Sequence, residues 1–351
     1  MTSLRINAPR VGIFSDLHLG VHTNSSQWHE IALTWARWQC EEFKKHKIKD
    51  IIFCGDWHHN RSEISVNTLQ VSADILDIFC DFNLILIVGN HDAYYKHRVD
   101  INSISIFKGR SNVTIVDDLT TLEAFSRKLT LCPWGCDLSA LKTSDVILGH
   151  LEIESFKMTQ YKVCEDGIKI SDILSKSPLV ISGHFHQRNE KKYNEGTVLY
   201  TGNPFQMDYG DADNAKGYYI LDLNTLVYNF FENNISPKYV KVNLSELVKN
   251  ESINDTIREQ FRGNFIKLYI DRNISHEDMI FLTNILNQLQ PLSLNIEYDI
   301  NYNVITSSNI EADFSGIDIE QAIIEFVNLL DIDDKKEIVN ITTALYNKCK
   351  A

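Results

Sequence analysis

The sequence predicts an α/β domain, followed by a smaller α+β unit and a C-terminal pair of helices. Two observations predict the α/β domain: short apolar runs that end abruptly in polar residues, and helix-like stretches between those runs. Alternation of buried strands with helices is typical of α/β proteins. The predicted strands cover residues 11–15, 51–54, 84–88, 146–148 and 179–182, and the predicted helices cover 28–45 and 65–79.

Three further strands are expected at 197–201, 217–221 and 227–231, and residues 233–237 read as a boundary. Beyond it, 265–270 is a plausible strand, and Ser275 is a plausible N-cap for a helix. The apolar stripe of that helix is Met279, Leu282, Ile285, Leu286 and Leu289. Strict alternation from 292 to 304 then places one set of apolar residues on one face of a half-buried strand. That set is Leu292, Leu294, Ile296, Tyr298, Ile300, Tyr302 and Val304.

The C-terminal segment carries two amphipathic helix patterns after a polar stretch at 306–314. Asp318 with Gln321 resembles a capping box at the first helix, and Asp334 with Glu337 begins the second. The stripes are Ile319, Ile323, Phe326 and Leu330, then Ile338, Ile341 and Leu345. Two short helices cannot bury such faces alone, so they either dock on the body or meet a partner.

Composition narrows the class of protein. The 351 residues hold 34 Lys and Arg against 47 Asp and Glu, a net charge of −13, which argues against nucleic-acid binding through a broadly basic surface. Seven scattered Cys indicate a reducing interior, and Cys132 and Cys136 are expected to be packing thiols. With no apolar leader and no run long enough to span a bilayer, we expect a soluble cytoplasmic protein without membrane contact.

The polar ends of the five strands collect metal-binding side chains. They are Asp16, His18, Asp56, Asn90, His91, His150, His184 and His186. Ligands of α/β sheets gather at the carboxyl ends of the strands, so these groups can converge. Carboxylate, imidazole and amide oxygen suit Mn²⁺, Fe²⁺ or Zn²⁺, and the missing thiolate disfavours structural zinc. Seven ligands, that is, all of these residues except His91, exceed what one catalytic ion with an open position needs, but fit two ions bridged by a carboxylate.

Each of these short motifs is a weak signal alone, but the five in this order, each after a buried strand, are specific. The set is Asp16-x-His18, Gly55-Asp56, Gly89-Asn90-His91-Asp92, Gly149-His150 and Gly183-His184-x-His186. It resembles the calcineurin-like metallophosphoesterases, and more narrowly the SbcD-type nucleases of recombination and double-strand-break repair, including the short form of large bacteriophages. Gly55-Asp56-Trp-His-His59 carries the narrower match, with Tyr200-Thr-Gly-Asn-Pro204 and Lys216-Gly-Tyr-Tyr219.

The resemblance implies a β-sandwich flanked by helices, in α-β-β-α layers, with a small α+β capping domain and a C-terminal helix pair. The motifs cover residues 11 to about 222, and the rest matches by architecture only. We expect a nuclease domain at 1–235, a capping domain at 240–304, a linker at 305–315 and an ATPase-binding segment at 316–351.

The resemblance also implies the site roles. One metal ion, expected to be Mn²⁺, would be held by Asp16, His18, Asp56 and His186. A second would be held by Asp56, Asn90, His150 and His184, with Asp56 bridging. His91 would act as general acid or orient the phosphate. His59 would help to set DNA ends in the site, unless it is an exposed loop residue. Asp92 either orients His91 or caps its loop.

The implied activity is exonuclease action on double-stranded DNA ends and endonuclease action on single strands. The implied partners are an SbcC-type coiled-coil ATPase and a second copy of this chain. One alternative is a phosphoprotein phosphatase or small-molecule phosphodiesterase on the same metal site, against which His59 and the C-terminal units argue. Another is a non-catalytic scaffold, which the intact ligand set disfavours.

Remaining basic and aromatic residues are open to two interpretations. Trp28, Trp35 and Trp38 have helical spacing that favours core packing over base stacking. The cluster Lys44, Lys45, Lys47 and Lys49 favours a solvated helix end over phosphate contact. The better candidates for the DNA backbone, because they follow metal motifs, are Lys96, Arg98, Arg188, Lys191 and Lys192. We expect the unmatched histidines at the surface: His22, His29, His46, His97 and His276.

Overall fold

The computed structural model describes residues 4–158, 162–249, 255–272, 274–298, 324, 327 and 335–350. Its contacts divide the chain into two compact units, Met1–Tyr298 and Asp299–Ala351. The boundaries expected from the sequence at 235, 240, 304 and 316 stay predictions.

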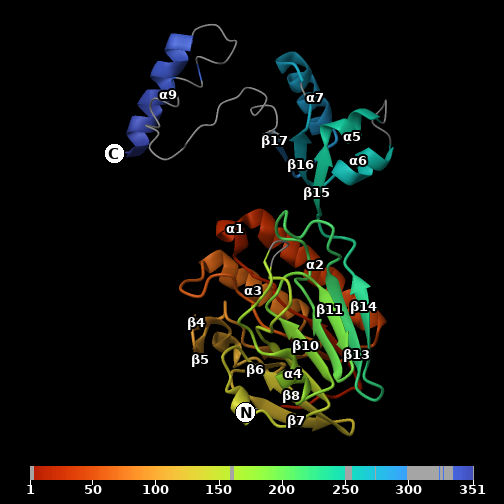
Figure 1. Cartoon of the computed structure of the whole chain (residues 1–351). Coiled ribbons are helices and arrows are strands. Elements are labelled where there is room, and N and C mark those ends of the chain that lie inside the picture. Colours follow the sequence, from red (N-terminus) through yellow and green to blue (C-terminus); the bar gives the residue numbers. More distant parts are fainter. Residues whose placement is uncertain are drawn as a thin grey trace. The chain divides into compact units, whose positions relative to one another are not determined.

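The first sheet has six strands in the order β14-β13-β1-β2-β3-β6 (Figure 1). Its parallel strands are β1 (Arg10–Phe14), β2 (Asp50–Phe53), β3 (Asn83–Ile87) and β6 (Val113–Val116). Two antiparallel strands, β13 (Gly217–Asp222) and β14 (Val227–Glu232), complete it beside β1. The three apolar runs predicted first therefore form the centre of one sheet.

The second sheet also has six strands, in the order β11-β12-β10-β9-β8-β7. Its parallel strands are β8 (Arg127–Cys132), β9 (Val146–His150), β10 (Leu179–Gly183) and β12 (Gly196–Tyr200). The antiparallel edges are β7 (Thr120–Ala124) and β11 (Asn189–Tyr193). The five predicted ligand-bearing strands are thus shared between two sheets.

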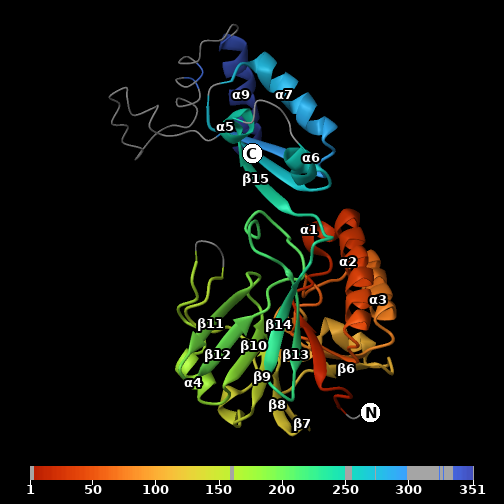
Figure 2. The same ribbon diagram turned by 90° about the vertical axis from the view of Figure 1, so that its right-hand side faces the viewer.

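The two sheets pack face to face, and helices cover their outer faces (Figure 2). The core between the sheets contains Ile13, Ile52 and Ile85 of the first sheet with Leu148 and Ile181 of the second. Helices α2 (Ser26–Lys45) and α3 (Val66–Ile78) cover the first sheet, and α4 (Ile170–Leu174) packs on the second. This arrangement confirms the expected α-β-β-α layers.

Helix α2 is buried along a wide face. Trp28 and Trp35 are buried and Trp38 is partly buried in the same core, which confirms that these residues pack instead of offering a stacking platform. His29 on this face is 3% exposed, and its ring nitrogens lie 3.0 Å from Thr68 Oγ1 and from Asn67 Nδ2. The expectation of a surface His29 is therefore wrong, because neighbouring polar side chains satisfy a buried imidazole.

Short elements connect the sheets and were not predicted. They are α1 (Val21–Asn24), the hairpin strands β4 (Ala93–Tyr95) and β5 (Arg98–Asn102), and the 3₁₀ turns Ser103–Phe107 and Leu138–Ala140. The hairpin continues directly from the Asn90-His91 motif. None of these elements is long enough to show a clear apolar period.

The chain then forms a small parallel sheet of β15 (Tyr239–Asn243), β16 (Phe265–Ile270) and β17 (Ser293–Tyr298). Three helices belong to it: α5 (Leu244–Lys249), α6 (Asp255–Phe261) and α7 (His276–Gln288). Ser275 caps α7 by accepting from Asp278 N, as predicted. Leu294 and Ile296 pack against the core, whereas Leu292 and Tyr298 are 39% and 62% exposed. The rest of the predicted face, at Ile300, Tyr302 and Val304, lies outside the described residues.

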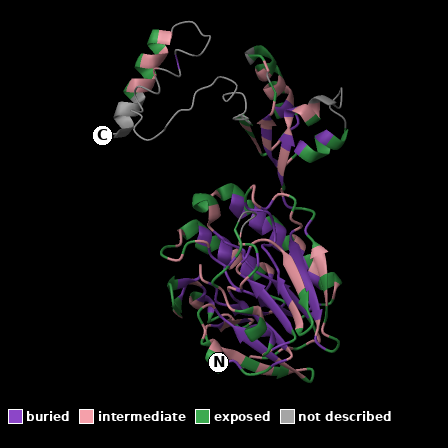
Figure 3. Cartoon of the chain, viewed as in Figure 1, coloured by how far each residue is buried: buried purple, intermediate pink, exposed green. Residues whose placement is uncertain are grey.

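An aromatic stack joins this small sheet to the larger domain. The rings of Trp28 and Phe265 are parallel to within 6°, with centroids 5.5 Å apart, and Tyr239 lies 4.7 Å from Phe265 on a second near-parallel plane. Figure 3 shows that burial is concentrated in the strands of the two large sheets.

In the second unit, α9 (Lys335–Lys350) confirms the second predicted C-terminal helix. The first, predicted from Asp318, lies outside the described residues except for Ile324 and Val327, which are helical. Among the described residues no helix is long and apolar enough to cross a membrane.

Candidate metal centre

Backbone contacts bring the predicted strand ends to one place. Asp16 N donates to Gly55 O at 2.9 Å, and His18 N donates to Asp56 O at 3.0 Å, which joins the β1 and β2 ends. The second sheet meets the first where His184 N donates to Asp16 Oδ1 at 3.1 Å. All eight predicted polar residues therefore gather at one edge of the sandwich.

One group of potential metal ligands consists of Asp16, His18 and His186. One ligand atom from each lies within 4.8 Å of the others, and His18 Nε2 is 2.9 Å from His186 Nε2. Two ring nitrogens that face each other so closely suit a shared cation. This is the ligand set predicted for one ion, apart from the bridging carboxylate.

A second group consists of Asp56, His150 and His184. Asn90 Oδ1 joins it at 2.8 Å from His150 Nε2 and 2.9 Å from His184 Nδ1. Asp56 Oδ2 is 3.3 Å from His150 Nε2 and 3.6 Å from His18 Nε2. The Asp56 carboxylate thus lies between the two groups, in the place that a bridging ligand needs.

Hydrogen bonds fix the orientation of a ligand ring. His150 Nδ1 lies 2.8 Å from Cys54 O, and because a carbonyl only accepts, Nδ1 must carry the proton. The Nε2 atom that faces Asn90 and Asp56 is then the one available to a metal. A backbone carbonyl behind a metal-binding imidazole is the usual way to set its tautomer.

Burial and charge shift the pKa values of these side chains in opposite directions. Burial, reinforced by His186, holds the pKa of His18 well below its ordinary value, and burial lowers the pKa of His184 to about 3, so both rings are neutral at pH 7. Burial alone would lower the pKa of His150, but the Asp56 carboxylate raises it to about 9. In return, His150 and His18 outweigh burial and lower the pKa of Asp56.

The donor set fits divalent cations. Asp16 and Asp56 are 0% and 1% exposed, and the ion-pair partners that the described residues give them are histidines. Buried carboxylates without a firm counter-charge are costly, and a metal ion removes that cost. Oxygen and imidazole donors without thiolate match the divalent ions expected from the sequence.

His91 and His59 lie beside the first group. His91 Nδ1 is 2.6 Å from His59 O and therefore carries its proton there, while His91 N donates to Asp56 Oδ1 at 2.8 Å. The His91 and His59 rings stack at 5.5 Å, and the His91 ring is 4.8 Å from that of His18. His59 is half-buried, with Nδ1 3.4 Å from His18 Nδ1, so it is not an exposed loop residue.

Asp92 caps the loops that carry the ligands. Its carboxylate accepts from the backbone N–H groups of Asp56, Trp57, His58 and Gly89, at 2.9 to 3.0 Å. Burial, with the nearby Asp56 charge, raises the pKa of Asp92 to about 7. Of the two roles left open by the sequence, the structure shows loop capping.

Two contacts of the ligands were missed by the sequence analysis. The Trp134 ring lies 4.9 Å from that of His184, and the Ser15 hydroxyl donates to Asp16 Oδ2. Ser15 follows an apolar run and precedes a ligand, which was a usable signal. Trp134 stands in a loop after β8 with no periodic pattern around it, so nothing local marked it.

Most basic side chains considered for DNA contact have partners within the protein. Lys44 and Lys45 pair with Glu41 and Glu42 on the exposed side of α2, as a solvated helix end does. The other pairs and contacts are Arg98 with Asp100, Lys192 with Glu190, Lys191 with Ser155 O, and Arg188 with Ala215 O and the Phe230 ring. Lys96 is exposed on the hairpin that follows the Asn90-His91 loop.

The Tyr200–Pro204 and Lys216–Tyr219 motifs meet at a buried ion pair. Lys216 Nζ donates to Asp211 Oδ1 and to His186 O, both at 2.6 Å. Asp211 Oδ2 also accepts from Asn203 Nδ2 at 2.8 Å. Lys216 thus fixes the backbone of His186, a predicted metal ligand.

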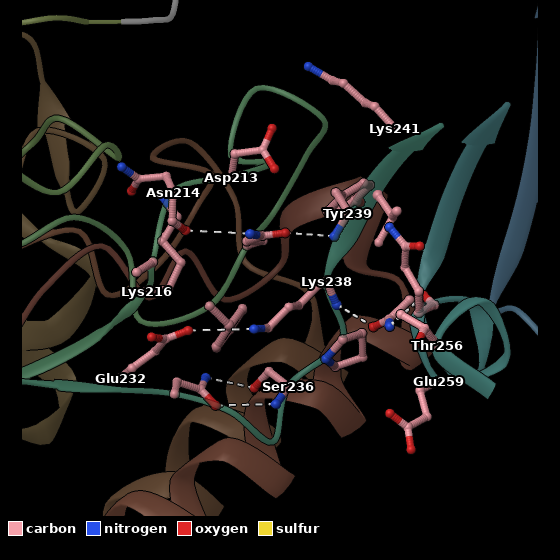
Figure 4. Close-up of a pocket in the computed structure, with 18 residues that line it drawn as sticks. Asp213, Asn214, Lys216, Glu232, Ser236, Lys238, Tyr239, Lys241, Thr256 and Glu259 are labelled. Carbon is pink, nitrogen blue, oxygen red and sulfur yellow. Dashed lines mark hydrogen bonds and ion pairs between the residues drawn. The ribbon is translucent and has the colours of Figure 1, made fainter. Parts of the chain in front are cut away.

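A cavity of about 620 Å³ contains none of the metal-centre residues. Figure 4 shows it between the loop of Asp213 and Asn214, the start of β15 and helix α6. Its lining mixes Lys238 and Lys241 with Glu232 and Glu259, so it has no single sign of charge. A smaller cavity of about 230 Å³ does reach the metal centre, at His150.

Comparison with known proteins identifies the family. Residues 10–226 match the model of the calcineurin-like phosphoesterase superfamily domain. The chain belongs to this superfamily. Membership confirms the resemblance drawn from the motifs, and with it an enzyme that hydrolyses phosphoesters by means of divalent metal ions.

Two relatives are more specific. The chain is 30% identical over 230 residues to exonuclease subunit 1 of Enterobacteria phage T4, a match that covers 62% of this chain and 66% of the phage protein. It is 23% identical to the SbcD subunit of the SbcCD nuclease of Staphylococcus epidermidis, with 89% of this chain and 90% of that protein covered. An archaeal phosphodiesterase of known structure shares 18% identity, with 64% of this chain and 99% of that chain covered and a TM-score of 0.36.

Proposed function

We propose that this protein is a two-metal DNA nuclease that acts in recombination and repair. One observation carries the proposal: Asp56 Oδ2 lies 3.6 Å from His18 Nε2 of the first ligand group and 3.3 Å from His150 Nε2 of the second, and Asp56 Oδ1 accepts from His91 N. DNA is the substrate of choice because both relatives are named nucleases. The expected activities are exonuclease action on double-stranded ends and endonuclease action on single strands.

The side chains of the centre have different proposed roles in metal binding and proton transfer. Asp16, His18, Asp56 and His186 would hold one ion, and Asp56, Asn90, His150 and His184 the other. Such a pair of ions, when bound, lowers the pKa of a shared water and neutralises the phosphoryl group. His91 keeps its Nδ1 proton on His59 O, which leaves Nε2 to hold a proton for the leaving oxygen. His59 keeps the His91 ring in place by stacking.

Removal of the His91 imidazole tests this assignment. With Mn²⁺, the intact chain should cleave end-labelled duplex DNA, and His91→Asn should lower the rate by roughly 10²–10⁴-fold, the usual contribution of a general acid. Binding of Mn²⁺, measured by titration calorimetry, should persist. His46→Asn, at the C-terminal end of α2 with its ring against Phe231, is the matched control. Unchanged cleavage by His91→Asn would refute the role.

A phosphatase or small-molecule phosphodiesterase is the competing function for the same centre. Hydrolysis of a nucleotide monoester and of linear duplex, compared at equal enzyme, separates the two. A chain that turns over the monoester and leaves the duplex intact would show that the nuclease proposal is wrong.

We further propose an SbcC-type coiled-coil ATPase as partner, with residues 316–351 as the docking segment, and a homodimer of this chain. The support is the named relative, a subunit of a nuclease complex, and the amphipathic α9, on which Ile341 is 53% exposed. Deletion of 316–351 should abolish co-purification with the ATPase and leave Mn²⁺ binding unchanged. Retained binding of the ATPase by the truncated chain would overturn the docking assignment.

A further inference from the structure

The cavity of about 230 Å³ that reaches His150 lies against the metal centre on the side of the second group. Its walls come from the loop after β8, the end of β9 and the segment 166–168, with His97 of the hairpin at its rim. Leu138, Leu151 and Ile168 give it apolar surface. A molecule in this cavity would therefore be next to whatever the metal ions hold.

Trp134 is the one aromatic ring other than histidine among the described lining residues. Its backbone N–H donates to Val88 O at 2.9 Å, and its indole N–H donates to Lys96 O at 3.0 Å. Both bonds tie the ring to the segment that carries Asn90 and His91. The indole is half-buried, so it is held in place while part of its surface remains accessible.

The charges of the cavity select against phosphate. Glu152 and Asp166 line it, and its described lining includes no Lys or Arg. A phosphodiester would be repelled there, whereas an uncharged planar ring would not. Apolar walls, a fixed indole and carboxylates together suit a nucleobase, which can stack on the indole and is not charged.

We propose that this cavity is a nucleobase subsite, in which the base next to the scissile phosphate leaves its stack and lies on Trp134. The inference rests on the proposed nuclease function. The centroid distance of 4.9 Å from Trp134 to His184 and of 6.1 Å to His150 places the indole within one nucleotide of the metal centre. The subsite would fix the strand while the metals engage its phosphate.

An abasic substitution tests the subsite. End-labelled DNA is digested with Mn²⁺ by the full chain, with a tetrahydrofuran residue placed on one or the other side of a single linkage. Loss of the base on the correct side should lower cleavage at that linkage roughly 5- to 150-fold, as loss of one base stack does. Trp134→Ala should lower the cleavage rate of intact DNA by the same factor. It should cleave the abasic strand at the same rate as the unaltered chain does.

Phe125→Ala is the matched control, because Phe125 is 38% exposed in the turn that precedes β8, at the opposite end of that strand from Trp134. It should cleave both substrates as the unaltered chain does. If Trp134→Ala slows both substrates equally, the indole only positions His184, and the subsite is refuted. Indifference of the unaltered chain to the abasic residue on either side would also refute it.

A second measurement separates the subsite from the nuclease function. The assay would compare deoxycytidine 5′-monophosphate with deoxyribose 5-phosphate as inhibitors of the hydrolysis of bis(p-nitrophenyl) phosphate. The nucleotide should inhibit at least fivefold more strongly, and Trp134→Ala should abolish the difference. If the unaltered chain leaves DNA intact but shows this difference, the proposed function fails and the subsite stands. Equal inhibition by both compounds would refute the subsite.

Discussion

The buried pair of Lys216 and Asp211 offers the sharpest test of how this structure holds its metal centre together. Their side chains are 3% and 4% exposed, and Lys216 Nζ also donates to the carbonyl of His186. Lys216→Met keeps most of the packing volume and removes the ammonium. Breaking one partner of a buried ion pair costs about 3–5 kcal/mol, a large share of an ordinary domain's stability.

The loss should depend on pH in a defined direction. Burial raises the pKa of Asp211, but Lys216 and the hydrogen bonds from Asn203 and Met207 lower it by more than burial raises it. The net pKa is therefore below the ordinary value. The pair therefore stabilises the protein above the unfolded pKa of Asp, and this contribution is lost as pH falls. In Lys216→Met the carboxyl takes up a proton more easily, so the difference in stability should shrink toward pH 4.

Urea denaturation at pH 7 and at lower pH measures both effects. The double variant Asp211→Asn/Lys216→Met should recover part of the loss, because no charge is then left buried without a partner. Lys192→Met is the control: its pair with Glu190 is 73% exposed on the lysine side and should change stability by less than about 0.5 kcal/mol. A loss below about 1 kcal/mol in Lys216→Met, independent of pH, would refute the reasoning.

Two further predictions concern the backbone around the ligands. Asp92→Asn leaves two of the four backbone N–H donors facing an amide NH₂ group. The free energy of unfolding, measured in urea, should therefore fall by about 2 kcal/mol or more. The control Asp100→Asn, on the exposed hairpin, should leave this free energy nearly unchanged. A neutral Asp92→Asn would contradict the capping role. Gly55→Ala should weaken Mn²⁺ binding roughly 10- to 100-fold, because φ is +92° and a Cβ would lie 2.3 Å from His150 Nδ1. Gly109→Ala, with open space around it, should bind Mn²⁺ normally, and equal affinities of the two variants would exclude this explanation.

The strand ends were predictable because each has a local signal, an apolar run, to which a general rule on the position of strand ends in a sheet applies. An apolar run such as 84–88 has few alternatives to a buried strand, and its polar end must lie at the sheet edge. The division into two sheets is not local, since Ile52 and Ile181 look alike in sequence and belong to different sheets. The prediction of two sheets came instead from the resemblance to the metallophosphoesterases.

Features made by several loops could not be found in the same way. The cavity beside His150 depends on how the segments around Trp134 and Ile168 meet, and no single stretch encodes that meeting. The burial of His29 depends on Thr68 and Asn67, about forty positions away. The capping role of Asp92 follows from four N–H groups, three of which belong to another strand end.

The aromatic stack of Trp28, Phe265 and Tyr239 also lies close, along the chain, to the predicted metal centre. Trp28 follows the predicted metal ligand His18 by ten positions, and the segment between them is anchored where His22 stacks on Trp28 at 4.7 Å and lies 2.8 Å from Met207 O. The small sheet is therefore connected, through stacked rings and one short segment of chain, to the strand end that carries Asp16 and His18.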